Sequence, residues 1–321
     1  CALTLARRTG VRLALLGRSA PDADTELRAN LERMTAAGLR CGYFAADVTD
    51  AAAVREAVAA AERDLGPITG LLHGAGTNVP QLISALEDDA FHRTLAPKVQ
   101  GLRHVLAAVN PERRRLLVTF GSIIARTGLP GEADYAVANE WLADLTARFQ
   151  EAHPHCRCLA IEWSVWSGVG MGQRLGRIET LMQQGITPIP PDQGVEILLD
   201  LLRQPLPATS VVVTGRFGEP PTLRMEKPEL PFLRFLEHPR VYYPGVELIV
   251  DAELSSETDP YVDEHVYHGE RLFPAVLGLE AMAQAAMALV NSSAPPSFAN
   301  VKLSRPVVVA KGRKTTIRLA A

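Results

Sequence analysis

Short apolar runs alternate with amphipathic stretches along the first two thirds of the chain. Apolar runs that end in glycine or polar residues predict buried strands at 11–19, 40–50, 68–76, 114–122, 156–166 and 208–215. Apolar positions at helical spacing predict helices at 24–38, at 51–66, in a stretch ending near Asn110, around Tyr135 and at 190–204. Strands that alternate with helices indicate an α/β fold, a doubly wound parallel sheet that binds ligands at the carboxyl ends of its strands.

This pattern ends at about residue 215. Four prolines and no regular period in residues 216–235 predict a linker. Beyond it, an alternating run at 246–255, a helical run at 274–290 and strands near the end predict a sheet with one helix. We therefore expect a first domain at 1–215, a linker at 216–235 and a partial α+β domain at 236–321.

Composition narrows the class of protein. A length of 321 residues favours two domains, and a net charge of -3 gives no electrostatic case for nucleic-acid binding. We expect neither a signal peptide nor a membrane helix, because no apolar run reaches the ~18 residues that a membrane helix needs. Four cysteines favour a cytoplasmic protein without a disulfide scaffold. The chain opens at Cys1 inside a helix-like run and ends in the strand-like "KTTIRLAA", which indicates part of a longer polypeptide.

Four residues of the first domain suggest the reduction of a ketone. Such a reduction needs a proton donor at the carbonyl oxygen, and a tyrosine serves if a neighbouring cation lowers its pKa from ~10. Tyr135 starts a predicted helix, Ser122 ends the preceding strand, and Lys98 lies on the helix before that strand. Asn139 lies one helical turn after Tyr135, so both face the same way. A tyrosine that only packs on a helix is the alternative interpretation.

The motifs around these residues resemble the ketoreductase domain of polyketide synthases, a branch of the short-chain dehydrogenases/reductases. The stretches that carry the resemblance are "APKVQG", "TFGSII" and "ADYAVAN", within residues 1 to about 215. In that family the lysine comes from the earlier helix and asparagine follows the tyrosine by four, as Lys98 and Asn139 do here. The longer stretch "GSIIARTGLPGEADYAVANEWL" is closest to the iterative synthases that build enediyne cores, which are relatives of polyunsaturated fatty acid synthases.

The resemblance also implies NADPH as the cofactor. Arg18 falls where the family holds the 2'-phosphate, although a solvated turn residue is the alternative interpretation. The other positions that the resemblance assigns to the cofactor are Asp47, Val48, Gly74, Ala75, Gly76, Trp166 and Gly168. The family's first strand and Gly-rich phosphate-binding turn are expected before Cys1, so this part alone is expected to bind NADPH badly.

Two further motifs imitate functional sites. The stretch "HPHCRC" gathers two histidines and two cysteines, but Cys156 and Cys158 enter a strand while the histidines precede it, so we expect no metal site. Residues 86–89, "LEDD", imitate a Leu-Asp-Asp stereochemical marker of the family but come too late; "NVP" at 78–80 occupies its place. Thr127 stands where the marker tryptophan of the other class would be, so the stereochemistry is not predicted.

The second domain carries a motif of its own in "DEHVYHGERLFPAVLGLEAM". His265, Gly269 and Pro274 resemble the H-x-x-x-G-x-x-x-x-P motif of the hot-dog dehydratases of fatty acid and polyketide synthases. The resemblance implies His265 as the base that removes an α-proton, with Gly269 and Pro274 at the substrate. Proline suits the first turn of a helix. We expect the acid of the second hot-dog repeat beyond residue 321.

Together these features predict a ketoreductase followed by part of a dehydratase of an iterative type I synthase. The expected substrate is a β-ketoacyl thioester on the phosphopantetheine arm of an acyl carrier protein, reduced to β-hydroxyacyl and then dehydrated. The expected partners are that carrier protein and the other domains of a homodimeric synthase. The alternatives are the same domains of a polyunsaturated fatty acid synthase, or a structural module whose active site is retired.

Overall fold

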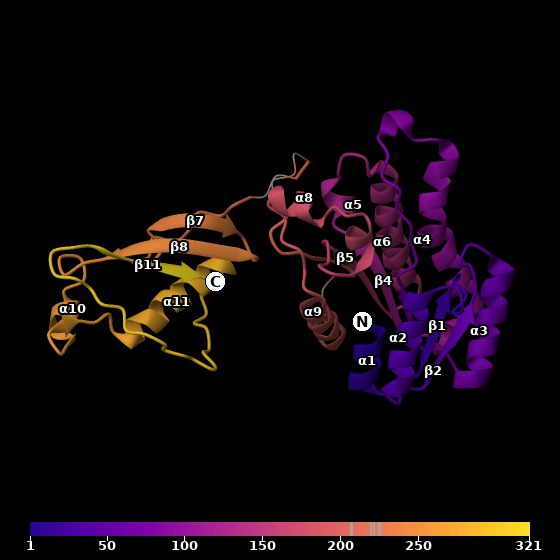
Figure 1. The fold of residues 1–321 in the computed structure, drawn as a ribbon, viewed down its shortest axis with the longest axis horizontal. Coiled ribbons are helices and arrows are strands. Elements are labelled where there is room, and N and C mark those ends of the chain that lie inside the picture. The colour runs from indigo at the N-terminus through magenta and orange to yellow at the C-terminus, as the bar shows by residue number, and fades with distance from the viewer. Residues whose placement is uncertain (206–207, 219, 221, 224–225) are drawn as a thin grey trace. The chain divides into compact units, whose positions relative to one another are not determined.

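The computed structural model describes residues 1–205, 208–218, 220, 222–223 and 226–321 (Figure 1). The chain divides into two compact units, Cys1–Leu223 and Arg224–Ala321. The division lies within the segment predicted as a linker, of which residues 219, 221, 224 and 225 fall outside the described residues. In the described part of the chain, no helix is long and apolar enough to cross a bilayer.

The first unit is a parallel α/β fold, as the alternation predicts. Its strands are β1 (Leu13–Gly17), β2 (Cys41–Ala45), β3 (Gly70–His73), β4 (Leu116–Ser122), β5 (Arg157–Trp163) and β6 (Ser210–Val213). Its longer helices are α1 (Ala2–Thr9), α2 (Thr25–Ala36), α3 (Ala51–Leu65), α4 (Asp88–Ala108), α6 (Ala133–Ala152) and α9 (Pro191–Arg203). Shorter helices are α5 (Ile124–Thr127), α7 (Gly170–Arg174) and α8 (Ile178–Gln183).

The parallel strands form two groups. β1 pairs with β2, and the order β3-β4-β5-β6 forms the second group; the described residues show no pairing of β1 with β3. Leu16 of β1 and Leu71 of β3 nevertheless pack against one apolar cluster under α3. In the usual strand order 3-2-1-4-5-6, the family's expected first strand would pair with both β1 and β3. That strand remains a prediction.

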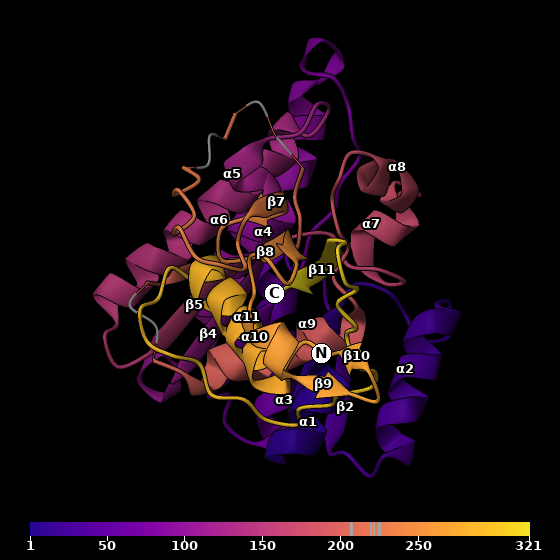
Figure 2. The same ribbon diagram turned by 90° about the vertical axis from the view of Figure 1, so that its left-hand side faces the viewer.

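Helices cover both faces of the central strands. Leu159, Ile161 and Trp163 of β5 point to the face that α9 covers through Leu198. Cys158 points to the opposite face, where helices α4 and α6 lie (Figure 2). This alternation is the period of a strand that is buried on both faces. It confirms the doubly wound architecture.

A glycine-rich turn sets the start of α6. After β4 and the short α5, Gly128 and Gly131 take φ angles of 62° and 81°, which side chains other than glycine rarely adopt. The Gly131 carbonyl accepts a hydrogen bond from the Gln81 amide at 2.9 Å. This hydrogen bond ties the start of the helix that carries Tyr135 to the segment after β3.

The second unit is an antiparallel sheet with one long helix. Strands β7 (His238–Tyr243), β8 (Glu247–Leu254) and β11 (Thr315–Ala320) pair in the order β11-β8-β7, and α11 (Ala275–Leu289) packs on them. The smaller elements are α10 (Tyr261–Glu264), β9 (Val266–Tyr267) and β10 (Glu270–Arg271). Alternate residues of β8, such as Leu248 and Val250, are fully buried. This arrangement confirms the partial α+β domain, while β7 was not predicted.

Candidate active site

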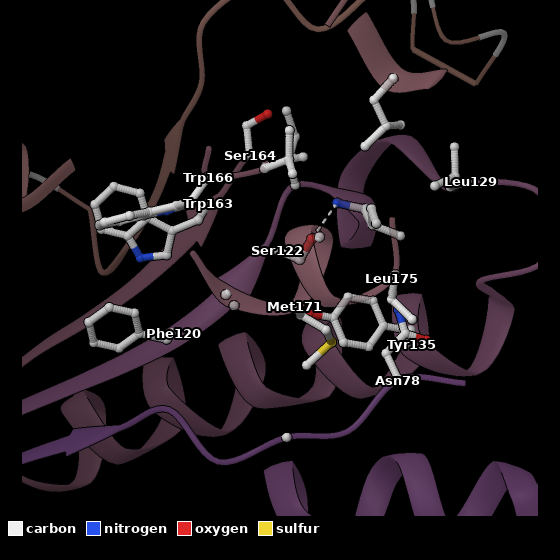
Figure 3. Close-up of a pocket in the computed structure, with 18 of the residues that line it drawn as sticks. Asn78, Phe120, Ser122, Leu129, Tyr135, Trp163, Ser164, Trp166, Met171 and Leu175 are labelled. Atoms are coloured by element: carbon white, nitrogen blue, oxygen red, sulfur yellow. Dashed lines mark hydrogen bonds between the residues drawn. The ribbon is translucent and has the colours of Figure 1, made fainter. Parts of the chain in front are cut away.

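One cavity of about 510 Å³ opens at the carboxyl ends of β4 and β5 (Figure 3). Its lining includes six residues that the sequence assigns to catalysis or cofactor binding: Gly74, Gly76, Lys98, Ser122, Tyr135 and Trp166. Parallel sheets bind ligands at this edge. The fold therefore brings half of the predicted first-domain site to one place.

Lys98 enters this cavity from α4 and exposes only 3% of its surface. Its Nζ donates a hydrogen bond to the Phe120 carbonyl at 3.1 Å and lies 5.6 Å from the centre of the Tyr135 ring. Burial lowers the pKa of Lys98 from 10.5 to about 8 because an ammonium group loses its hydration in the interior. The lysine therefore titrates much closer to neutrality than a surface lysine.

The turn of α4 that carries Lys98 is held by a buried histidine. His73, the last residue of β3, has its Nε2 at 3.1 Å from the Pro97 carbonyl. Burial lowers the pKa of His73 to about 4, with the Lys98 charge as a smaller cause. The ring is therefore neutral at neutral pH, and its Nε2–H donates to the carbonyl.

Tyr135, whose ring faces Lys98 Nζ, exposes 9% of its surface. Burial raises the pKa of its phenol, and the neighbouring side chains of Asn139 and Ser122 only partly offset this rise. The expectation that a nearby cation lowers the tyrosine pKa is therefore wrong for this state of the site. Desolvation disfavours the phenolate more than its neighbours favour it.

Ser122 and Asn139 flank the tyrosine in different ways. Ser122 Oγ accepts a hydrogen bond from the Ile124 amide at 3.3 Å, drawn in Figure 3, and lines the cavity. Asn139 Nδ2 donates to the Tyr135 carbonyl at 2.6 Å, and the residue lies buried behind the tyrosine rather than in the cavity lining. Asn139 thus fixes the first turn of α6.

Other predicted cofactor positions lie outside the cavity lining. Arg18 is exposed just after β1, and its charge helps to lower the pKa of Asp47, although hydrogen bonds from Thr49 are the larger cause. The Val48 carbonyl lies 2.9 Å from His104 Nδ1, within hydrogen-bond distance. Gly168 is exposed, with φ of 66°. Together with Ala75, these residues follow the ends of β1, β2, β3 and β5, along one edge of the strands.

Comparison with known families identifies both units. The family model of the KR domain matches residues 1–168, just over half of the 321 residues. The chain belongs to the family of ketoreductase domains. The model of the polyketide synthase dehydratase domain matches residues 238–321. The matched families follow one another as the sequence predicts.

Relatives of this ketoreductase domain lie in large synthases. The chain is 32% identical over 193 residues to polyketide synthase PksN of Bacillus subtilis, covering 58% of this chain and 3% of PksN. It is 25% identical over 266 residues to a polyunsaturated fatty acid synthase subunit of Thraustochytrium sp., covering 82% of this chain and 8% of that relative. The chain thus spans less than a tenth of either relative.

Solved ketoreductases share the fold of the first unit. A ketoreductase domain from the bacillaene assembly line is 27% identical, with a TM-score of 0.56 over 66% of this chain and 52% of that one. A ketoreductase from the first module of phoslactomycin biosynthesis in Streptomyces sp. HK803 is 26% identical, with a TM-score of 0.59 over 66% and 49%. The ketoreductase assignment therefore rests on sequence and fold together.

Some residues of the ketoreductase cavity were not predicted. Glu132, Arg177 and Trp163 line it, as does Asn78, which the sequence marks only as part of "NVP". Glu132 lies only three residues before Tyr135, although outside α6, and this nearness in the sequence is the one signal that could have pointed to it. Arg177 follows no periodic pattern, so the sequence holds no comparable signal for it.

The dehydratase motif spans a helix end, a short hairpin and the start of α11. His265 and His268 lie on either side of β9, which covers only Val266–Tyr267. His268 and Gly269 form the two-residue turn of a β9–β10 hairpin, with φ of 49° and 80°. His265 is exposed at the end of α10. Pro274 immediately precedes α11 instead of starting its first turn.

The burial of Lys98 yields a prediction for stability. Its pKa falls from 10.5 to about 8 on folding, so the unfolded chain binds the proton more readily between these values. Burying the charged lysine therefore lowers the free energy of unfolding by an amount of order 3 kcal/mol. This cost applies fully below pH 8 and disappears as the pH rises to 10.5. Lys98→Met should remove it, so the variant should unfold at higher urea than wild type at about pH 7, and this gain should shrink towards about pH 10.

The exposed Lys302 offers the matched control. Lys302→Met should leave the free energy of unfolding within about 0.5 kcal/mol of wild type at both pH values. A gain for Lys98→Met that does not change with pH would show that Lys98 is not a buried titrating group.

Proposed function

We propose that the first unit reduces β-ketoacyl thioesters on an acyl carrier protein to β-hydroxyacyl thioesters, with NADPH as the reductant. The observation that carries the proposal is the gathering of Ser122, Tyr135 and Lys98 around one cavity. A phenol with a raised pKa stays protonated at neutral pH and can serve as the acid for a carbonyl oxygen. Ser122 Oγ is available to hydrogen-bond the same oxygen as charge develops on it.

Lys98 and Asn139 support the tyrosine in this scheme. When Tyr135 gives up its proton, the phenolate faces the Lys98 ammonium across the 5.6 Å that separates Nζ from the ring centre. Both groups are shielded from water, so this attraction is stronger than it would be in solvent. Asn139 holds the Tyr135 backbone in place through its 2.6 Å hydrogen bond.

The cavity offers chemistry that suits a nicotinamide cofactor. Asn78 Oδ1 and Trp163 Nε1 are buried polar atoms without a hydrogen-bond partner among the described residues, and both residues line the cavity. A side chain on Gly74 or Gly168 would meet open space, so a ligand can approach the backbone at both. We propose that Arg18, Asp47, Val48, Gly74, Ala75, Gly76, Trp166 and Gly168 hold NADPH. When bound, it supplies the hydride.

We further propose that the second unit contributes His265 to the dehydration of the β-hydroxyacyl product. The exposed imidazole stands just before the β9–β10 hairpin, and the backbone carbonyl of His265 accepts from the Leu272 amide at 2.9 Å. That bond ties His265 to the segment leading through Pro274 into α11. Gly269 and Pro274 would then border the thioester. A histidine suits α-proton removal because its pKa lies near neutrality.

The type of synthase is the finer part of the proposal. We favour an iterative, homodimeric polyketide synthase of the enediyne kind, on the resemblance of residues 121–142. The similarity to the polyunsaturated fatty acid synthase of Thraustochytrium sp. spans both units, so the same domains of such a synthase are the second candidate. Mass spectrometry of the released products of the whole polypeptide separates the two. A retired structural module would bind no NADPH.

Tyr135→Phe in the complete synthase should abolish ketone reduction. Loss of the acid should lower kcat by roughly 10²-fold or more, while NADPH binding stays unchanged. Steady-state reduction of a simple β-ketoacyl thioester and fluorescence titration with NADPH measure the two. Tyr267→Phe, at an exposed hairpin position, is the control and should behave as wild type. Near-normal turnover of the Tyr135 variant would contradict the proposed role.

Arg18→Ala should weaken the use of NADPH alone. Removal of a cation facing the 2'-phosphate should raise the KM for NADPH about tenfold and leave the KM for NADH nearly unchanged. Arg40 is likewise exposed and precedes the amino end of β2, so Arg40→Ala controls for loss of charge. Equal effects of Arg18→Ala on both cofactors would assign Arg18 a structural role.

His265→Ala in the complete synthase should stop the pathway at β-hydroxyacyl products and spare ketone reduction. Carrier-bound chains should then retain one additional water per missed dehydration, which mass spectrometry detects. The control is His268→Asn, because asparagine tolerates the positive φ of that turn better than alanine. It should still yield olefin. Continued olefin formation by the His265 variant would remove the case for His265 as the base.

A further inference from the structure

A buried carboxylate links three segments around the cavity. Glu132, the residue before α6, exposes 2% of its surface. Its Oε1 accepts from Arg177 Nη1 at 2.9 Å, and its Oε2 accepts from Asn78 Nδ2 at 2.5 Å. Arg177 comes from the connection between α7 and α8, and Asn78 from the segment after β3. All three residues line the cavity together with Tyr135.

The segment that carries Arg177 forms one wall of the cavity. Residues 170–183, which comprise α7, α8 and their connection, are called the lid segment below. Met171, Leu175 and Leu181 of the lid segment line the same cavity as Tyr135, and Figure 3 draws Met171 and Leu175 together with the tyrosine. The position of the lid segment therefore determines how the cavity is closed over the tyrosine.

The ionic contact gives the lid segment one preferred position. A carboxylate without a partner is costly to bury, and burial accordingly raises the pKa of Glu132. The Arg177 guanidinium, whose side chain is 40% exposed, supplies the compensating charge from the lid segment. A second tie at the same helix end is the hydrogen bond of the Gln81 amide to the Gly131 carbonyl.

We propose that Glu132 is a positioning residue that fastens the lid segment, through Arg177, and the 77–82 segment, through Asn78, to the amino end of the helix bearing Tyr135. This proposal rests on the reduction proposed above, because the fastened segments would enclose the β-ketoacyl thioester. It assigns Glu132 no contact with the reacting atoms. If the proposal holds, loss of either Glu132 or Arg177 has the same effect on the lid segment as loss of both.

The test is a double-mutant cycle in the complete synthase with Glu132→Gln, Arg177→Gln and both together. Amide hydrogen exchange of residues 170–183 should quicken in each single variant, and the double variant should be no faster than either. The KM for the β-ketoacyl thioester should rise about fivefold in the same three proteins, with kcat changed less than about twofold. Arg174→Gln is the control, since Arg174 lies on the lid segment but pairs with Glu26 at the surface.

The two readouts separate the possible failures. Additive effects in the cycle, or exchange as slow as in wild type, would overturn the proposed fastening. Exchange that quickens equally in Arg174→Gln would likewise overturn it, because it would reflect loss of lid charge alone. If the complete wild-type synthase reduces no β-ketoacyl thioester, the proposed function fails, while hydrogen exchange still decides whether Glu132 holds the lid segment.

Discussion

Lys98 carries an ammonium group into the interior of the α/β unit, and several neighbouring residues make that burial possible. The Phe120 carbonyl accepts a hydrogen bond from its Nζ at 3.1 Å. A side chain on Gly76 would approach Lys98 Cε to 3.1 Å, so glycine leaves room for the lysine as well as for a ligand. His73 Nε2 lies within hydrogen-bond distance of the carbonyl of Pro97, the residue before Lys98 in α4. The glycine-rich segment after β3 and the proline-containing helix α4 thus both help to accommodate the buried Lys98 ammonium.

Two kinds of contact position Tyr135: apolar packing holds α6 on the sheet, and buried hydrogen bonds fix its register. Apolar contacts between Leu142 and the Cys158 face of the strands hold α6 against the sheet, but such contacts have no directional preference. Thr119 of β4 and Thr146 of α6 share a buried hydrogen bond at 2.9 Å, and Thr94 of α4 donates to Asp134 at 2.6 Å. Such bonds are satisfied at one register only. They fix the tyrosine relative to both the sheet and the lysine helix.

The hydrophobic pattern predicted most helices and strands, because the periods of both depend on residues that are close together in the sequence. Leu159, Ile161 and Trp163 alternate with residues of the opposite face, and β5 formed where expected. The tyrosine pKa was misjudged because burial depends on helices far away in sequence. The His268–Gly269 turn was missed because its strands have two residues each. The Glu132–Arg177 contact spans 45 positions and follows no motif.

The pKa values of Lys98 and Tyr135 shift in opposite directions, so the two groups lose their protons at well-separated pH values in the cavity, unlike in water. In solution the phenol and the ammonium lose their protons at nearly the same pH. In the cavity burial lowers the pKa of Lys98 to about 8 and raises the pKa of Tyr135, so the lysine deprotonates first. Tyr135 therefore keeps its proton across the range in which Lys98 changes charge. In the proposed reduction Tyr135 gives that proton to the substrate, and the new phenolate would favour a charged Lys98. In that scheme the lysine acts after the proton transfer, as the charge that stabilises the phenolate.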